Sequence, residues 1–195
     1  MTEPRARLAV LASGGGSNLQ AILDHLDAHP DAGVRCVLVL SDRENAGALD
    51  RARARGIEAL WLPARENARM LAELRARRVT HVALAGYLRL VPAEVVHAFD
   101  QRMLNVHPAL LPKFGGPGMH GRHVHEAVLA AGETVSGATV HLVSERFDEG
   151  LILAQRAVGV MPDDTPESLA ARVLEAEHQL YPRTLLDLIC GRIRT

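Results

Sequence analysis

The sequence contains few of the residues that mark disulfide-rich, zinc-binding or membrane proteins. Its 195 residues include two Cys, at positions 36 and 190, and no CxxC pair, so neither a disulfide framework nor a cysteine zinc site is expected. No apolar run approaches the ~20 residues of a transmembrane helix, and no signal-type apolar segment opens the chain. These absences predict a cytoplasmic protein without a membrane partner.

An excess of charge of one sign is also missing. The chain has 22 Lys and Arg against 23 Asp and Glu, which gives a net charge of −1. Proteins dedicated to nucleic acids usually carry a strong basic excess, so a nucleic-acid partner is not expected. The ten His residues are the feature of the composition that most invites a functional interpretation.

The first half of the chain alternates apolar runs with helical patterns. The apolar runs at 8–12, 34–40, 57–62, 79–85 and 103–106 are expected to form strands. Helical patterns separate them at 18–29, 46–55, 66–78 and 92–99. Strands that alternate with helices predict right-handed crossovers and a parallel sheet.

The pattern changes after residue 106. A loop rich in Pro and Gly at 107–119 precedes a helix at 122–131, and apolar stretches at 134–143 and 152–160 have no helix between them, which predicts antiparallel pairing. Thr165 is a good N-cap for a long helix that starts at Pro166. The predicted fold is α/β, a Rossmann-like and mostly parallel sheet flanked by helices, with antiparallel strands in the C-terminal part. We expect residues 1–195 to form one domain, with an N-terminal half at about 8–106 and a C-terminal part at about 107–192.

A glycine-rich segment lies between the first predicted strand and the first helix. Gly14, Gly15 and Gly16 are followed by Ser17 and Asn18. Backbone N–H groups in such a turn can converge on an anion at the positive end of the helix. The segment lacks the Lys of a P-loop and the last Gly of GxGxxG. We interpret it as a phosphate site, with a merely tight strand-to-helix connection as the alternative.

Polar side chains that suit proton transfer occur at the end of the fifth strand and in a later turn. Asn105 and His107 alternate along the strand and therefore project to the same side, at the sheet edge where ligand crevices open in α/β proteins. An amide can donate to an oxyanion and an imidazole can move a proton near neutral pH. Asp148 would matter if it approached His107, because a carboxylate raises the pKa of an imidazole. The alternatives are a strand-end His that is satisfied by backbone and a solvated turn carboxylate.

The group His120, His123, His125 and Glu126 invites a metal interpretation, which the spacing disfavours. On a helix, positions 123 and 125 are about 200° apart and cannot share a ligand face. No HExxH or Cys/His spacing occurs, so no metal is expected. Neither Cys has a neighbouring motif that indicates a nucleophilic thiolate.

Five segments together carry a resemblance to a known family. They are SGGGSNLQA (13–21), LAGYLRLV (84–91), NVHPALLPKF (105–114), FDEG (147–150) and EAEHQLYP (175–182), in this order. The chain resembles the glycinamide ribonucleotide formyltransferases, folate-dependent enzymes of purine biosynthesis, over nearly its whole length. The NxHPxLLP element is shared by the wider folate formyltransferase superfamily, while the GSNLQA and EHxxYP elements narrow the resemblance to this family.

The resemblance implies a reaction and a set of roles. A formyl group would pass from the cosubstrate 10-formyltetrahydrofolate to the glycine amine of phosphoribosylglycinamide by direct acyl transfer, without a metal. Asn105 would stabilise the oxyanion, His107 would donate or shuttle a proton, and Asp148 would raise the pKa of His107 and order a relaying water. Both partners would be small molecules, and the protein would be a monomer or a homodimer.

The same resemblance implies contacts for each substrate. The substrate phosphate would contact Gly15, Gly16, Ser17 and Asn18, and the ribose would contact Glu177. The folate would contact Arg65, Leu88, Arg89, Leu90, Val91, Asn105, Val143 and Phe147. Arg69 is an alternative to Arg65 for the glutamate tail of the folate.

The chain departs from the family pattern in three places, and related functions remain as alternatives. The Gly- and His-rich stretch at 115–125 is longer than usual, Leu174 stands where relatives often have a polar or basic residue, and Glu149 follows Asp148 where a small residue is common. A methionyl-tRNA formyltransferase would need a further C-terminal domain and a basic surface, and a formyltetrahydrofolate deformylase a further N-terminal domain. A non-catalytic binder of phosphoribosyl ligands would not need Asn105, His107 and Asp148 together.

Overall fold

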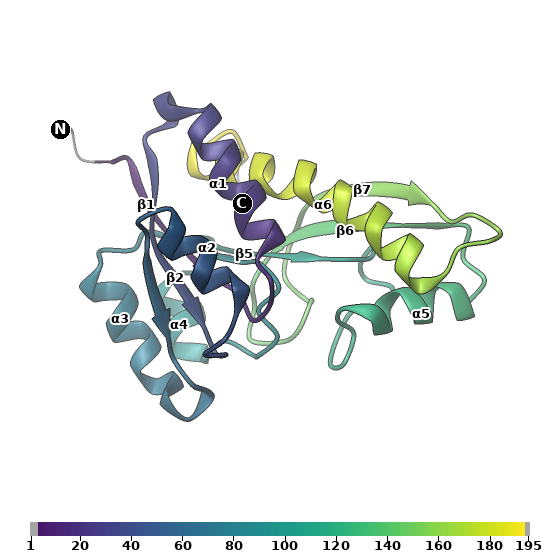
Figure 1. Ribbon diagram of the computed structural model, residues 1–195, viewed down its shortest axis with the longest axis horizontal. Coiled ribbons are helices and arrows are strands. Elements are labelled where there is room, and N and C mark those ends of the chain that lie inside the picture. Colours follow the sequence, from purple (N-terminus) through teal and green to yellow (C-terminus); the bar gives the residue numbers. More distant parts are fainter. Residues whose placement is uncertain (1–3, 194–195) are drawn as a thin grey trace.

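The computed structural model describes residues 4–193 and places one seven-stranded sheet at the centre of the molecule (Figure 1). The strands lie in the order β3-β2-β1-β4-β5-β6-β7. The first five are parallel, whereas β6 is antiparallel to β5 and β7 is antiparallel to β6. The predicted α/β fold with antiparallel C-terminal strands is therefore confirmed. The strand bounds are β1 Ala6–Leu11, β2 Val34–Ser41, β3 Glu58–Trp61, β4 His81–Leu84, β5 Met103–His107, β6 Val135–Leu142 and β7 Ile152–Gly159.

Helices cover both faces of the sheet because both faces of its central strands are apolar. Every residue of β1 is buried except Arg7, which is half-buried. One hydrophobic cluster joins the sheet to α1, α2 and α6, and another joins it to α3 and α4. The helix bounds are α1 Ser17–Ala28, α2 Gly47–Ala54, α3 Met70–Ala76, α4 Ala93–Ala98, α5 Arg122–Ala130 and α6 Pro166–Ile189, with short 3₁₀ helices η1 Pro30–Ala32 and η2 Ala64–Arg69.

The helix predicted at 66–78 is the element that differs most from expectation. It is divided into the 3₁₀ helix η2 and the shorter α-helix α3. Pro63 precedes η2 in an extended conformation, and the amide of Glu66 donates to the carbonyl of Pro63, which gives the tighter turn that often starts a helix. η2 has no buried residue, in agreement with the polar sequence of this stretch.

The long helix α6 is fixed at its start and along its length. Thr165 and Ser168 form a capping box, in which each side chain accepts a hydrogen bond from the backbone N–H of the other. Further along, the fully buried Tyr181 places its hydroxyl 3.0 Å from the carbonyl oxygens of both Leu84 and Leu104. This hydroxyl therefore ties α6 to β4 and β5, the strands that lead into the site described below. None of the helices within residues 4–193 is long and apolar enough to cross a membrane.

We expect Tyr181→Phe to lower the free energy of unfolding by about 1–3 kcal/mol, because it removes the buried donor of two backbone carbonyls. Tyr87→Phe is a matched control, since the buried Tyr87 hydroxyl has no hydrogen-bond partner among the described residues and its removal should cost nothing. Urea denaturation of the two variants measures the difference. Equal losses would show that the Tyr181 hydroxyl does not hold α6 in place.

Candidate active site

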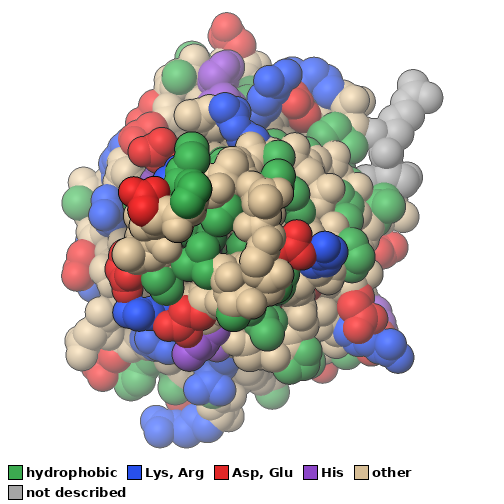
Figure 2. Space-filling model, turned by 90° about the vertical axis from the view of Figure 1, so that its right-hand side faces the viewer, with side chains coloured by type: hydrophobic (Ala, Val, Ile, Leu, Met, Phe, Trp, Pro, Cys, Tyr) green, Lys and Arg blue, Asp and Glu red, His purple; other side chains and the backbone are tan. Residues whose placement is uncertain are grey.

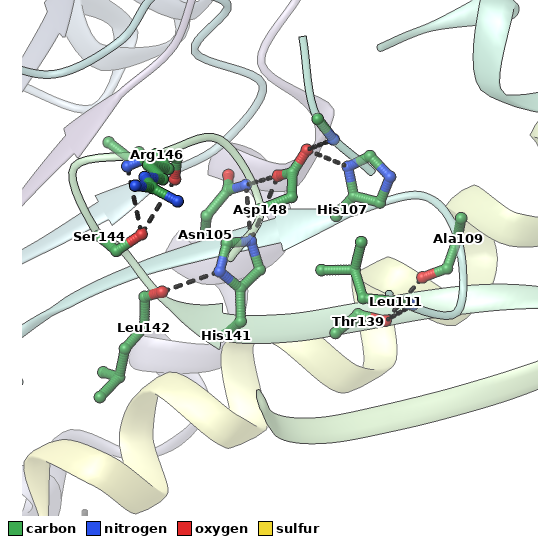
Figure 3. Close-up of polar contacts among 12 residues, drawn as sticks. Asn105, His107, Ala109, Leu111, Thr139, His141, Leu142, Ser144, Arg146 and Asp148 are labelled. Atoms are coloured by element: carbon green, nitrogen blue, oxygen red, sulfur yellow. Dashed lines mark hydrogen bonds and ion pairs between the residues drawn. The ribbon is translucent and has the colours of Figure 1, made fainter. Parts of the chain in front are cut away.

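Asn105, His107 and Asp148 come together at one end of the sheet (Figure 3). Asn105 and His107 lie on β5 and point to the same side, as alternation along the strand predicts. Asp148 comes from the connection between β6 and β7 and reaches both of them. Its Oδ1 lies 3.4 Å from Asn105 Nδ2, and its Oδ2 lies 3.4 Å from His107 Nδ1. The condition set by the sequence for a role of Asp148, proximity to His107, is therefore met.

The two ring nitrogens of His107 have different partners. Nε2 lies 2.7 Å from the carbonyl oxygen of Phe114, so this nitrogen carries the proton of the neutral ring and donates it. Nδ1 is then unprotonated and faces the carboxylate of Asp148. Burial lowers the pKa of His107, and the opposing effect of the Asp148 carboxylate offsets this only in part. The ring is therefore neutral near pH 7, with a free site for one more proton.

Asp148 adopts a backbone conformation that few residues other than glycine adopt. Its φ is +59°, in the left-handed region that Asp tolerates better than most residues. Gly150 lets the loop close on β6, because a Cβ there would lie 1.6 Å from the carbonyl oxygen of Leu142. The Asp148 carboxylate also accepts the amide of Gly116 at 2.9 Å. Burial favours a raised pKa for Asp148, but the neighbouring His141 and His107 and the hydrogen bond from the Gly116 amide lower it overall, so the group is ionised near neutral pH.

His141 belongs to this cluster although its role was not predicted from the sequence. It lies on β6 directly opposite Asn105 in the sheet register. Its Nδ1 lies 2.8 Å from the carbonyl oxygen of Leu142, and its Nε2 lies 3.1 Å from Asn105 Nδ2 and 3.5 Å from Asp148 Oδ1. The pairing register of β5 and β6 was the signal that could have revealed it, because a residue opposite Asn105 must share its side of the sheet.

A cavity of about 550 Å³ opens beside these residues. Figure 2 shows the end of the molecule formed by α5 and the start of α6, where hydrophobic side chains gather toward the middle of the face and charged ones lie mostly at its margin. The walls combine the catalytic candidates with Asn18 of α1 and with residues of α5 and α6. They include Asn18, Leu88, Asn105, His107, Gly116, His125, Phe147, Asp148, Leu174 and Glu177.

The Gly-rich loop forms the start of α1, and no side chain caps this helix end. Gly16 is the N-cap residue in the left-handed conformation, with φ 77°. The amide nitrogens of the first turn have no partner within the helix, which is the arrangement that binds anions. Gly15 and Ser17 lie in this turn and loop, and Asn18 lines the cavity. Of the four predicted phosphate residues, Asn18 lines the cavity that Asn105 and His107 also line, and Gly15, Gly16 and Ser17 directly precede it in the chain.

Glu177 is brought to the same cavity from α6. Its Oε2 accepts a hydrogen bond of 2.6 Å from Asn18 Nδ2, while the buried Oδ1 of Asn18 has no partner. Burial raises the pKa of Glu177 to about 7, with the hydrogen bond from Asn18 as a smaller opposing effect. These two buried polar side chains, 159 residues apart in sequence, face a cavity with unused hydrogen-bonding capacity.

The residues expected to contact folate line two adjoining cavities, with the exception of Arg65. A smaller cavity of about 40 Å³ shares Tyr87, Asn105, Phe147 and Asp148 with the large one. Arg89, Leu90, Val91, Val143 and Phe147 line it, and Leu88 lines the large cavity. Arg65 lies on η2, outside the residues that line either cavity, and its side chain is 79% exposed. Arg69, the alternative, is engaged by Glu66 and Glu73.

The Gly- and His-rich stretch contributes backbone to the site. Phe114 and Gly116 bind His107 and Asp148 as described, and the buried His125 faces the cavity with its Nδ1 unpaired. Burial lowers the pKa of His125, and the nearby His107 lowers it further. Within residues 4–193, no group of three or more His, Cys, Asp or Glu side chains is placed to hold a metal ion. Of the other departures, Leu174 lines the cavity, whereas Glu149 is directed to Arg146 at 3.4 Å.

Comparison with known proteins identifies one family. Residues 6–185 match the model of the formyl transferase family. The chain is 46% identical over 202 residues to the chloroplastic phosphoribosylglycinamide formyltransferase of Arabidopsis thaliana, covering 98% of this chain and 68% of that protein. The corresponding protein of Vigna unguiculata is 46% identical, with coverage of 99% and 64%. The chain thus spans about two thirds of the length of these plant relatives.

Solved structures agree with the sequence comparison. A glycinamide ribonucleotide transformylase of Symbiobacterium toebii superposes with a TM-score of 0.90 and 40% identity, covering 97% of this chain and 90% of that one. A phosphoribosylglycinamide formyltransferase of Brucella melitensis has a TM-score of 0.86 and 40% identity, with coverage of 98% and 99%.

We expect Glu177→Gln to change how stability depends on pH. Because the folded-state pKa of about 7 lies above the ordinary value of 4.5, the folded protein keeps a proton that the unfolded chain releases, and stability falls as pH rises through this window. The stability of the variant relative to the parent should therefore increase by about 1–3 kcal/mol between pH 5 and pH 8, measured by urea denaturation. Glu175→Gln, on the exposed side of the same helix, is the control. A constant difference between Glu177→Gln and the parent would contradict the raised pKa.

Proposed function

The chain belongs to the formyl transferase family, and from this membership we propose that it transfers a formyl group from 10-formyltetrahydrofolate to the glycine amine of 5′-phosphoribosylglycinamide, a step of purine biosynthesis. The observation that carries the proposal is the convergence of Asn105, His107 and Asp148 on a cavity that Asn18 and Glu177 also line. One cavity thus offers groups for proton transfer and groups for a phosphorylated ribose.

The chemistry requires stabilised negative charge and a proton carrier. When the amine attacks the formyl carbon, a new C–N bond forms, the carbonyl oxygen becomes an oxyanion, and the bond to the folate nitrogen then breaks. The amine must lose a proton and the leaving nitrogen must gain one. The unprotonated nitrogen of His107 can take that proton, directly or through a water, and Asp148 stabilises the imidazolium until the proton is returned.

Asn105 supplies the donor for the oxyanion. In the free protein its Nδ2 is directed to His141 at 3.1 Å and to Asp148 at 3.4 Å. The second of these hydrogen bonds is long, so a developing oxyanion can replace it as the acceptor at low cost. His141 then keeps the amide oriented through the shorter bond.

The two substrates use different walls of the site in this proposal. The phosphate contacts the backbone from Gly15 to Asn18, and Glu177 accepts hydrogen bonds from the ribose hydroxyls. The folate lies along 88–91, with Val143 and Phe147 over its ring and Arg65 at its glutamate tail. Because the smaller cavity of about 40 Å³ holds little more than a water, the loop at 143–148 must shift to admit a bicyclic ring.

The remaining parts of the proposal concern the protein as a whole. Residues 1–195 act as one catalytic domain in the cytoplasm, as a monomer or a homodimer. Its partners are the two small molecules, and neither a nucleic acid nor a membrane takes part.

The test is an absorbance assay of the folate product with the purified protein, phosphoribosylglycinamide and a 10-formyl folate. Turnover is expected only when both substrates are present. Product formation without the amine would indicate a deformylase, and transfer to methionyl-tRNA would indicate the tRNA-modifying relative. Absence of turnover with the ribonucleotide would refute the proposal.

We expect Asn105→Ala to lower kcat by about 10²–10³, which is the typical cost of removing one oxyanion donor. The KM values should change little, because the interaction is made mainly in the transition state. Asn45→Ala, at an exposed position after β2, serves as the control. A loss of less than fivefold would remove Asn105 from the oxyanion site.

Asp148→Asn should lower the pKa of His107 further, because it removes the charge that opposes the effect of burial. The acid limb of the profile of kcat against pH should then move to lower pH, while the rate on the plateau falls. NMR titration of the ring protons of His107 provides a measurement that does not depend on turnover. An unchanged or raised pKa would contradict the assigned interaction.

A further inference from the structure

Helix α2 donates hydrogen bonds to two carbonyls of the Gly-rich loop, and the sequence patterns do not indicate these contacts. The amide of Ala48 donates to the carbonyl of Gly14 at 3.1 Å, and Arg51 Nε donates to the carbonyl of Gly15 at 2.7 Å. We propose that Arg51 is a positioning residue for the substrate phosphate. By binding the carbonyl of Gly15, it orients the peptide between Gly15 and Gly16 so that the Gly16 N–H can bind the phosphate. This inference rests on the proposed function, in which that loop binds the phosphate of the ribonucleotide.

The geometry of the peptide bond carries the first step. In a trans peptide the C=O and the following N–H point in opposite directions. The one cis peptide within residues 4–193 is Leu111–Pro112, so both loop peptides are trans. Because α2 binds the carbonyls of Gly14 and Gly15, the amides of Gly15 and Gly16 must point away from α2. Two successive N–H groups on one side, next to a residue in the left-handed conformation, form the kind of concavity that binds anions.

Close packing leaves the loop little freedom to turn these amides back. A Cβ on Gly16 would lie 2.8 Å from Ala48 Cα, and a Cβ on Gly47 would lie 3.3 Å from Gly15 Cα. The loop and the start of α2 therefore touch backbone to backbone. Only the side chain of Arg51 adds a charge to this contact.

The charge of Arg51 is not neutralised. Besides the Gly15 carbonyl, its guanidinium contacts the neutral Gln20 at 3.3 Å, and no ion pair of Arg51 with a described carboxylate is present. Arg53, on the same helix, is instead paired with Asp50 at 2.8 Å. A cation bound to a carbonyl polarises the peptide and makes its N–H a stronger donor. Arg51 thus orients the Gly16 amide and increases its attraction for an anion.

The cavity itself offers a phosphate little positive charge. Among its lining residues the only Lys or Arg is Arg122, which is already engaged by Glu126 and Glu167. At Leu174, one turn before Glu177, the wall is apolar. The unpaired Oδ1 of Asn18, a side chain that is 8% exposed, independently indicates that this wall receives a polar ligand. A doubly charged phosphate at the loop would therefore rely on the backbone amides and on the cation behind them.

The experiment compares Arg51→Gln and Arg51→Lys with Arg53→Gln, an arginine on the same helix that is also exposed. Arg51→Gln should raise the KM for the ribonucleotide about tenfold, the scale of one charge-assisted hydrogen bond, with kcat and the KM for folate unchanged. Arg51→Lys should restore part of the loss, because the charge returns without the planar fork. Arg53→Gln should match the parent. A parent-like KM in Arg51→Gln would overturn the proposal.

A second measurement separates phosphate positioning from general support of the loop. Calorimetric binding of phosphoribosylglycinamide is compared with binding of its dephosphorylated riboside, in the parent and in Arg51→Gln. Only the phosphorylated ligand should lose affinity, and the thermal midpoint should stay unchanged. Equal losses for both ligands, or a lowered midpoint, would assign Arg51 a merely structural role. Because binding needs no turnover, a parent that binds the ribonucleotide without transferring a formyl group would refute the proposed function and still test Arg51.

Discussion

A single carboxylate, whose side chain is 9% exposed, connects the parts of the candidate active site. Asp148 contacts Asn105 and His107 on β5 and His141 on β6, and it accepts the amide of Gly116 from the Gly-rich stretch before α5. A buried carboxylate without such partners would be costly, so the loop that carries it and the segments that contact it must adopt their positions together. The geometry of the site depends on this mutual satisfaction.

The reversal of strand direction after β5 makes this arrangement possible. In a wholly parallel sheet the connection after β5 would have to return to the opposite end of the strands before the next strand began. Here β6 instead runs back antiparallel beside β5 and puts His141 opposite Asn105. The connection from β6 to β7 then folds over this pair, and Gly150 permits its close approach to Leu142. The departure from the parallel pattern thus brings a distant aspartate to the strand that holds the histidine.

The other half of the site depends on contacts between helices and the Gly-rich loop. α6 supplies Glu177 to Asn18, and α2 binds the carbonyls of Gly14 and Gly15. A further link leads from this loop toward the segment at 88–91. Ser13 Oγ donates to Asp42 at 2.6 Å and accepts the amide of Leu88 at 3.0 Å, and Asp42 also binds Arg89. Hydrogen bonds of the buried Ser13 therefore connect the walls proposed for the two substrates.

The sequence by itself determined the alternation of strands and helices, the antiparallel C-terminal strands and the capping of α6, because periodicity and capping are local properties. It also placed Asn105 and His107 on one side of a strand, because side chains alternate along a strand. The tertiary structure decided which distant groups meet them. His141, the Phe114 carbonyl and the Gly116 amide depend on strand register and loop path, which local patterns do not encode. The net lowering of the pKa of His107 was likewise decided by burial, a property of the folded chain that outweighs the charge of the neighbouring Asp148.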